Sequence, residues 1–159
     1  MRKIIINQAA ENTPSSDPNF LNLEHLAQVE FTSECLEHPV ESALSLAEDS
    51  GAGWQAACAG EQTIRLVFDQ PHTIEHIFLV FDEPQQSRTQ EFVLLWLMDK
   101  EEAYREILRQ QYHFSPPNTT REIEHYQVRL NQLKVLELRI IPDISGGEAC
   151  AGLKQLRLA

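Results

Sequence analysis

The fold of this chain is decided by the turn Gly51-Ala52-Gly53-Trp54-Gln55-Ala56 and the strand that comes after it, Gln62-Thr63-Ile64-Arg65-Leu66-Val67-Phe68-Asp69-Gln70-Pro71. In that strand every second residue is apolar from Ile64 to Phe68, which predicts one buried and one exposed face. A proline ends it, and the apolar run 74–81 begins a second strand. A glycine turn that presents a tryptophan between short strands is typical of an all-β protein.

The rest of the chain repeats this alternation of strand and turn. We expect strands at about 29–33, 62–69, 73–82, 89–98, 103–112, 121–130, 134–142 and 151–158. Segment 101–109 also fits a helix, although its flanking strands favour a strand. A short helix is expected over 39–46, because Pro39 suits its first turn and Glu41 the positive end of its dipole. Short strands at regular spacing favour one β-sandwich over an α/β enzyme.

Composition bounds the classes of partner. The chain has 159 residues, enough for one domain, and its 24 acidic against 13 basic residues leave a net charge of -11. Nucleic acid and anionic membranes are therefore not expected as partners, because both require a basic surface. The N-terminal apolar run is too short for a signal peptide, and three cysteines without CxxC spacing predict thiols and a cytoplasmic location. We expect a partly ordered arm over 1–22 and a domain over 23–159.

The lengths of the connections predict where a site lies. If consecutive strands are antiparallel, one end of the sandwich carries the short links 70–72, 99–102 and 131–133. The other end, called here the long-loop end, carries the loops at 83–88, 113–120 and 143–150 and the excursion 34–61. Loops grouped on a rigid scaffold are the usual carriers of binding residues, so we expect any site at the long-loop end.

The order of these features resembles the discoidin family, also called coagulation factor 5/8 type C domains, within the galactose-binding-like jelly rolls. The resemblance covers about residues 26–158 and rests on these segments: 29–34, 38–44, 53–56, 62–66 with 71–74, 104–107, 136–140 and 151–156. It implies an eight-stranded antiparallel jelly-roll β-sandwich with one short helix before the glycine-tryptophan turn. It also implies a non-catalytic role in which loops at one end bind sugars, phospholipid head groups or proteins.

Many members of that family hold a structural calcium with an acidic residue near the glycine turn and a glutamate in the last strand. Asp49 stands at the first of these positions, but Gln155 stands where glutamate is usual. Losing one anionic oxygen weakens a calcium site. The resemblance therefore implies no cofactor beyond a possible calcium at Asp49.

Five polar residues of the long loops are the candidate ligand contacts: Arg88, His113, Asn118, Asp143 and Glu148. A guanidinium such as that of Arg88 can bind a carboxylate or vicinal hydroxyls in a bidentate manner. Asp143 and Glu148 flank a Ser-Gly-Gly turn and can accept hydrogen bonds from hydroxyls. Each of the five also has a simpler interpretation as a surface residue, and Asp143 as a side chain that caps its own turn.

Other residues favour structural roles. The resemblance implies that Trp54 lies in the core beside the glycine turn, rather than serving as a stacking platform for a sugar. His72 and His76 are four apart on a strand, about 13 Å along it, too far to share one ion. No catalytic motif is present, so no catalytic residue is assigned. The resemblance implies a non-enzymatic binding module with carbohydrate as the ligand class. A protein-interaction domain using a sheet face or edge strand is the alternative.

Overall fold

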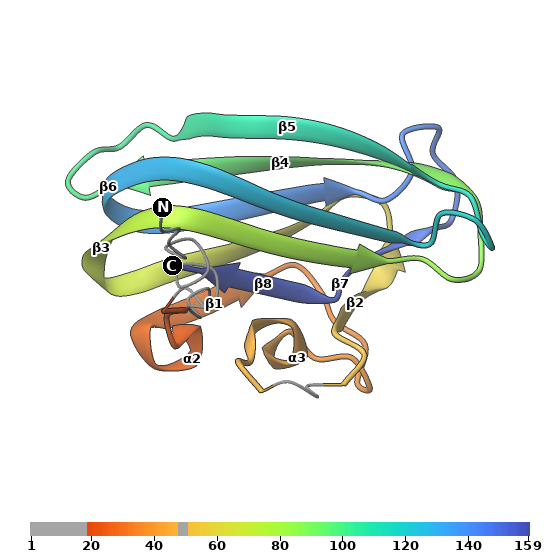
Figure 1. Cartoon of the computed structure of the whole chain (residues 1–159), viewed down its shortest axis with the longest axis horizontal. Coiled ribbons are helices and arrows are strands. Elements are labelled where there is room, and N and C mark those ends of the chain that lie inside the picture. The colour runs from red at the N-terminus through yellow and green to blue at the C-terminus, as the bar shows by residue number, and fades with distance from the viewer. Residues whose placement is uncertain (1–18, 48–50) are drawn as a thin grey trace, which may run out of the picture.

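Two facing layers of antiparallel strands build the protein in the computed structural model, which describes residues 19–47 and 51–159 (Figure 1). The described residues hold two short helices, α2 (Leu23–Leu26) and α3 (Glu41–Leu44). Their eight strands are β1 (Ala27–Phe31), β2 (Trp54–Ala59), β3 (Gln62–Asp82), β4 (Arg88–Met98), β5 (Arg105–Phe114), β6 (Arg121–Ile141), β7 (Cys150–Leu153) and β8 (Gln155–Leu158). The expected eight-stranded antiparallel jelly-roll sandwich is confirmed.

The long strands β3 and β6 each belong to both layers. The five-strand layer has the order β1, the first part of β3, the last part of β6, β4 and β5. The three-strand layer consists of β8, the segment 74–82 of β3 and the segment 121–130 of β6. Strands β2 and β7 pair separately. Four of the expected strands are therefore two continuous strands, each of which bends between the layers.

The bend in β3 has a physical cause at Pro71. Regular pairing with β6 stops after Val67 and resumes through His72 to Ile74, with a register shift at each step. Proline has no backbone N–H to donate to the ladder, so the pairing is interrupted there without leaving an unsatisfied donor. The chain changes layer at this interruption.

Apolar residues at alternate positions of the strands face one another and form the core. Trp54 is only 2% exposed, and its Nε1 donates to the carbonyl of Ser33 at 2.9 Å, which confirms its place in the core. The largest completely buried side chains besides Trp54 are those of Phe68, Phe81, Phe92, Phe114, Ile64, Leu66, Ile77 and Leu79. The alternation in the sequence thus predicted which face of each strand is buried.

Gly53 explains why the turn before Trp54 needs glycine. Its φ is +84°, and a Cβ at this position would lie 2.5 Å from the carbonyl oxygen of Leu153. Strand β7 therefore packs directly against the backbone of the turn. This close approach fixes Trp54 at the start of β2, where it faces the core.

The structure differs from the expected elements in the helices and in the N-terminal arm. The helix expected over 39–46 is confirmed as the shorter α3, whereas α2 was not expected. Segment 105–114 is a strand, which excludes the helix considered for 101–109. Residues 19–22 of the expected arm pack on the domain, since the Leu21 N–H donates to the carbonyl of Leu158 at 2.8 Å.

In the described part of the chain, no helix is both long enough and apolar enough to cross a membrane.

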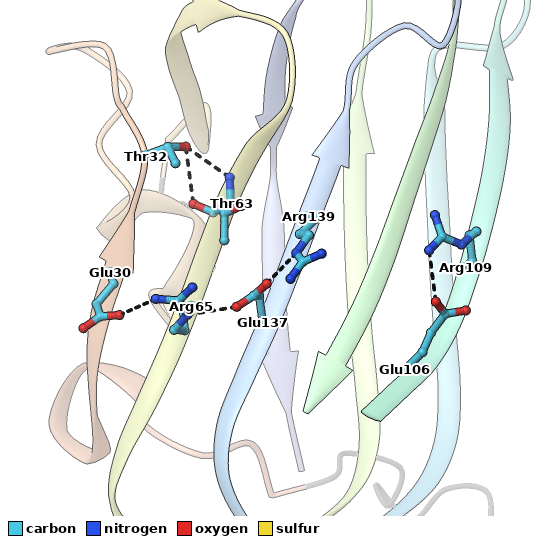
Figure 2. A network of polar contacts seen from close by, with 8 residues as sticks. All are labelled: Glu30, Thr32, Thr63, Arg65, Glu106, Arg109, Glu137 and Arg139. Carbon is cyan, nitrogen blue, oxygen red and sulfur yellow. Dashed lines mark hydrogen bonds and ion pairs between the residues drawn. The ribbon is translucent and has the colours of Figure 1, made fainter. Parts of the chain in front are cut away.

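A row of ion pairs crosses the outer surface of the five-strand layer (Figure 2). Arg65 on β3 bonds to Glu30 on β1 and to Glu137 on β6, each at 2.9 Å, and Arg139 bonds to Glu137 at 2.5 Å. Glu137 is only 1% exposed, so its charge depends on these two guanidiniums. Hydrogen bonds to Glu30 and Glu137 raise the pKa of Arg65 above its usual value. The row joins three strands through their side chains.

Candidate functional site

The loops between β3 and β4, β5 and β6, and β6 and β7 meet at one end of the sandwich, on the right in Figure 1. The Glu83 N–H donates to the carbonyl of Thr120 at 2.7 Å, which joins the first two loops. The Ile144 N–H donates to the carbonyl of Thr89 at 2.9 Å, which joins the third loop to β4. The grouping of long loops that their lengths predicted is therefore present.

A cleft of about 350 Å³ opens at this long-loop end. It lies between the β3–β4 loop, the turn before β2 and strand β7. Its lining combines apolar and polar side chains: Ala52, Trp54, Pro84, Leu153, Cys150 and Gly152 on the one hand, and His38, Gln55, Asp82, Glu83, Gln85, Arg88 and Lys154 on the other. Mixed linings of this kind are characteristic of small-ligand sites.

A buried ion pair shapes one wall of the cleft. Arg88 is 4% exposed; its Nε donates to Oε1 of Glu83 at 2.7 Å, and its Nη1 donates to the carbonyl of Pro142 at 2.7 Å. Its guanidinium also lies over the ring of Phe114, 4.8 Å from the centroid. Arg88 thus ties the β3–β4 loop to the β6–β7 loop.

The carboxylate of Glu83 organises its own loop as well. Its Oε2 accepts the backbone N–H groups of Gln85 and Gln86 at 2.9 and 3.2 Å. Burial opposes the charge, but the hydrogen bonds from Arg88 and from the two N–H groups prevail and lower the pKa of Glu83. The wall is therefore preorganised before any ligand arrives.

A second carboxylate of the cleft, that of Asp82, also forms an ion pair. Asp82 accepts Nε of Arg121 at 2.7 Å and Nη2 at 3.1 Å, in a bidentate arrangement. The bidentate pair fixes the position of the Asp82 carboxylate at the cleft.

The five candidate contacts predicted from the sequence are dispersed around this end. Arg88 lines the cleft, but its donors are directed at Glu83, Gln90 and Pro142. The other four lie outside the cleft lining: His113 is exposed and within 2.8 Å of the Thr89 hydroxyl, Asn118 and Glu148 are exposed, and Asp143 is half-buried.

Asp143 has the local role that was the alternative interpretation. It accepts the N–H and the hydroxyl of Ser145 at 3.1 and 2.7 Å, and these bonds lower its pKa. Sequence reasoning did not select the cleft residues Glu83, Gln85, His38 and Lys154. The spacing of Glu83 and Arg88 across a proline-containing loop was the available signal, because opposite charges five residues apart can pair across a tight turn.

The calcium expectation concerns a residue outside the described part of the chain, because Asp49 is not described. Gln155, the other residue of that expectation, is half-buried on β8 opposite Val80. Within residues 19–47 and 51–159, no three His, Cys, Asp or Glu side chains converge as a metal site.

Solved structures with this fold include sugar-binding and protein-binding domains. The family 32 carbohydrate-binding module of Clostridium perfringens NanJ, in complex with galactose, matches with a TM-score of 0.58 and 11% identity over 87% of this chain and 96% of that one. XRCC1 bound to the DNA polymerase beta catalytic domain matches with a TM-score of 0.57 and 17% identity over 84% and 95%. These matches show that the chain has the jelly-roll β-sandwich fold of these domains.

The same fold also occurs inside larger enzymes. A Ruminococcus gnavus GH29 fucosidase in complex with fucose matches with a TM-score of 0.67 and 9% identity, over 99% of this chain but only 30% of that one. Neither a family model nor a curated protein matches the sequence. At these low identities the likeness extends to the fold alone.

Proposed function

We propose that the protein is a non-catalytic carbohydrate-binding module that holds its ligand in the cleft at the long-loop end. The observation that carries this proposal is the preorganised polar wall of the cleft, where Arg88 and Glu83 are buried and hydrogen-bonded to each other. A sugar presents hydroxyl groups and apolar C–H faces, which match the mixed lining. The structural neighbours that bind galactose and mannuronic acid support the ligand class.

Gln85 is the cleft residue best suited to recognise a hydroxyl group. It lines the cleft with an exposed side chain, while its backbone N–H is held by Glu83. Its amide therefore stands on a fixed backbone and can both donate and accept. His38, which lines the cleft from the segment before α3, provides a second contact.

A glycan array followed by calorimetry on the best ligand tests the proposal, using Gln85→Ala and the neighbouring Gln86→Ala as a matched pair. Both side chains are exposed and both backbones bond to Glu83, but only Gln85 lines the cleft. We expect Gln85→Ala to weaken binding by about threefold to tenfold, the value of one hydrogen bond, and Gln86→Ala to leave it unchanged. Absence of any glycan binding, or equal effects of the two variants, would contradict the proposal.

A protein-interaction role is the second candidate, and specific side chains favour it. Leu36 is 96% exposed and Ile144 49% exposed, both in loops that flank β2 or β4. Among the described strands, β5 pairs with β4 alone, so it offers a ten-residue edge to another strand. A specific partner that is lost on Leu36→Ser, together with a silent glycan array, would support this role.

The thiol state of Cys35, Cys58 and Cys150 supports the proposed cytoplasmic location for either role.

A further inference from the structure

Two histidines that are 49 residues apart in the sequence lie side by side on the outer face of the three-strand layer. His76 is on β3 and His125 on β6, and Nδ1 of His76 is 3.0 Å from Nε2 of His125. In the register of the two strands, His76 is opposite Gln127 and His125 is opposite Phe78, so the two rings are diagonal neighbours. Neither histidine belongs to the cleft lining.

The aromatic residues around this pair hold one of its rings in place. The ring of His125 stacks on Phe78 with centroids 4.1 Å apart and planes 14° apart. Phe20 meets the same Phe78 edge-on at 5.2 Å. Stacking restricts the rotation of His125, so less freedom is lost when its nitrogen binds a ligand.

We propose that His76 and His125 together bind a divalent transition-metal ion, with Zn²⁺ as the reference ion. Two imidazole nitrogens at about 2.1 Å from a tetrahedral ion are about 3.4 Å apart, close to the observed separation. The ion takes the place of the hydrogen between the two nitrogens, and a small rotation of the half-buried His76 ring directs both lone pairs to it. Imidazole favours Zn²⁺, Ni²⁺ and Cu²⁺ over Ca²⁺ and Mg²⁺, which prefer oxygen.

Two protein ligands leave the remaining coordination positions to water or to a group on a bound partner. The side-chain amide of Gln127, opposite His76, stands next to the pair. The net charge of -11 favours the approach of any cation but does not select the metal. Selection comes from the two nitrogens, and binding requires both rings to be neutral.

Titration of the full chain with Zn²⁺ tests the proposal, with calorimetry for affinity and imidazole NMR resonances for location. We expect the resonances of His76 and His125 to shift together, and His76→Gln or His125→Gln to weaken binding at least about tenfold. His25→Gln is the matched control, since His25 is an exposed histidine on α2 whose ring is hydrogen-bonded to Asn22. Ca²⁺ should shift neither ring.

Outcomes that overturn the proposal are distinct from those of the carbohydrate experiment. Unchanged Zn²⁺ affinity in His125→Gln, or Zn²⁺ shifts at His25 as large as at the pair, would overturn it. Zn²⁺ binding by thiols such as Cys58 would leave the imidazole resonances of His76 and His125 unshifted. NMR therefore distinguishes such binding from binding at the pair, and thiol binding would also overturn the proposal. Metal-free melting temperatures of the variants confirm that each is folded, because both positions are at the surface.

Discussion

Arg88 and Glu83 form a 2.7 Å ion pair across the tight loop between β3 and β4, with the Arg88 side chain 3% and the Glu83 side chain 12% exposed. Because Arg88 also donates a hydrogen bond to the carbonyl of Pro142, the pair connects the β3–β4 loop to the β6–β7 loop at the wall of the cleft. Arg88, a candidate ligand contact from the sequence, thus joins the two loops through its guanidinium, and its contact with a ligand stays a prediction.

Removing one partner of this pair should cost more than removing both. Arg88→Met leaves the Glu83 carboxylate without its guanidinium, and we expect a loss of about 3–5 kcal/mol in the free energy of unfolding. The double variant Arg88→Met/Glu83→Gln should be less destabilised than Arg88→Met alone, because no unpaired charge remains. Urea denaturation measures both, and a double variant that is the less stable of the two would show that the charge is not the cause.

The row of ion pairs on the five-strand layer predicts a contrast between two glutamates. Glu137→Gln removes a buried carboxylate between Arg65 and Arg139 and leaves two guanidiniums close together, so we expect a loss of about 3 kcal/mol. Glu106→Gln breaks an ion pair with Arg109, which is solvated, and should not change stability measurably. Figure 2 shows both pairs. Equal midpoints of denaturation for the two variants would contradict this prediction.

The turn before Trp54 predicts a difference between two glycines with similar backbones. Gly53→Ala places a Cβ 2.5 Å from the carbonyl of Leu153 at a φ of +84°, and we expect a loss of about 2–4 kcal/mol. Gly60→Ala has a φ of +91° but meets nothing within 4 Å, so only the backbone penalty of about 1–2 kcal/mol applies. Thermal melts followed by circular dichroism compare them. Equal melting temperatures would mean that β7 can move away from the turn.

Glu122 predicts how stability depends on pH. It is 1% exposed between the layers, and its Oε1 accepts Nε2 of Gln90 at 3.2 Å. Within the part of the chain that the structure describes, its Oε2 has no hydrogen-bond partner. Burial, together with the neighbouring Glu124, raises the pKa of Glu122 to about 9 from 4.5. The folded protein therefore holds a proton that the unfolded chain has released, and this group's contribution to stability declines as pH rises from about 4.5 to 9.

Glu122→Gln removes this dependence while keeping an acceptor for Gln90. We expect the variant and the parent to have similar stability near pH 5, and the variant to become progressively the more stable of the two towards pH 9. Urea denaturation at several pH values gives the difference. A difference that does not change with pH would mean that Glu122 is already ionised in the folded protein.

Local pattern determined the strands, the buried faces and the grouping of the loops. Alternation from Ile64 to Phe68 is a property of neighbouring residues, and a strand with one apolar face has to bury it whatever its partner is. The place of Trp54 in the core followed from the resemblance to the discoidin family, and the structure confirms it. Connection lengths sufficed to place the long loops at one end, because antiparallel strands alternate in direction.

Only the tertiary structure decided which polar groups meet. Continuity of β3 through Pro71 depends on pairing with β6, whose residues are more than 50 positions away, so sequence alone divided it into two strands. The inward turn of Arg88 depends on the carbonyl of Pro142, and the partner of His76 is not His72 but His125 on another strand. The periodicity of side chains along a strand shows which residues face the core. Contacts between polar groups on different strands depend on the strand register, which cannot be read from a short stretch of sequence.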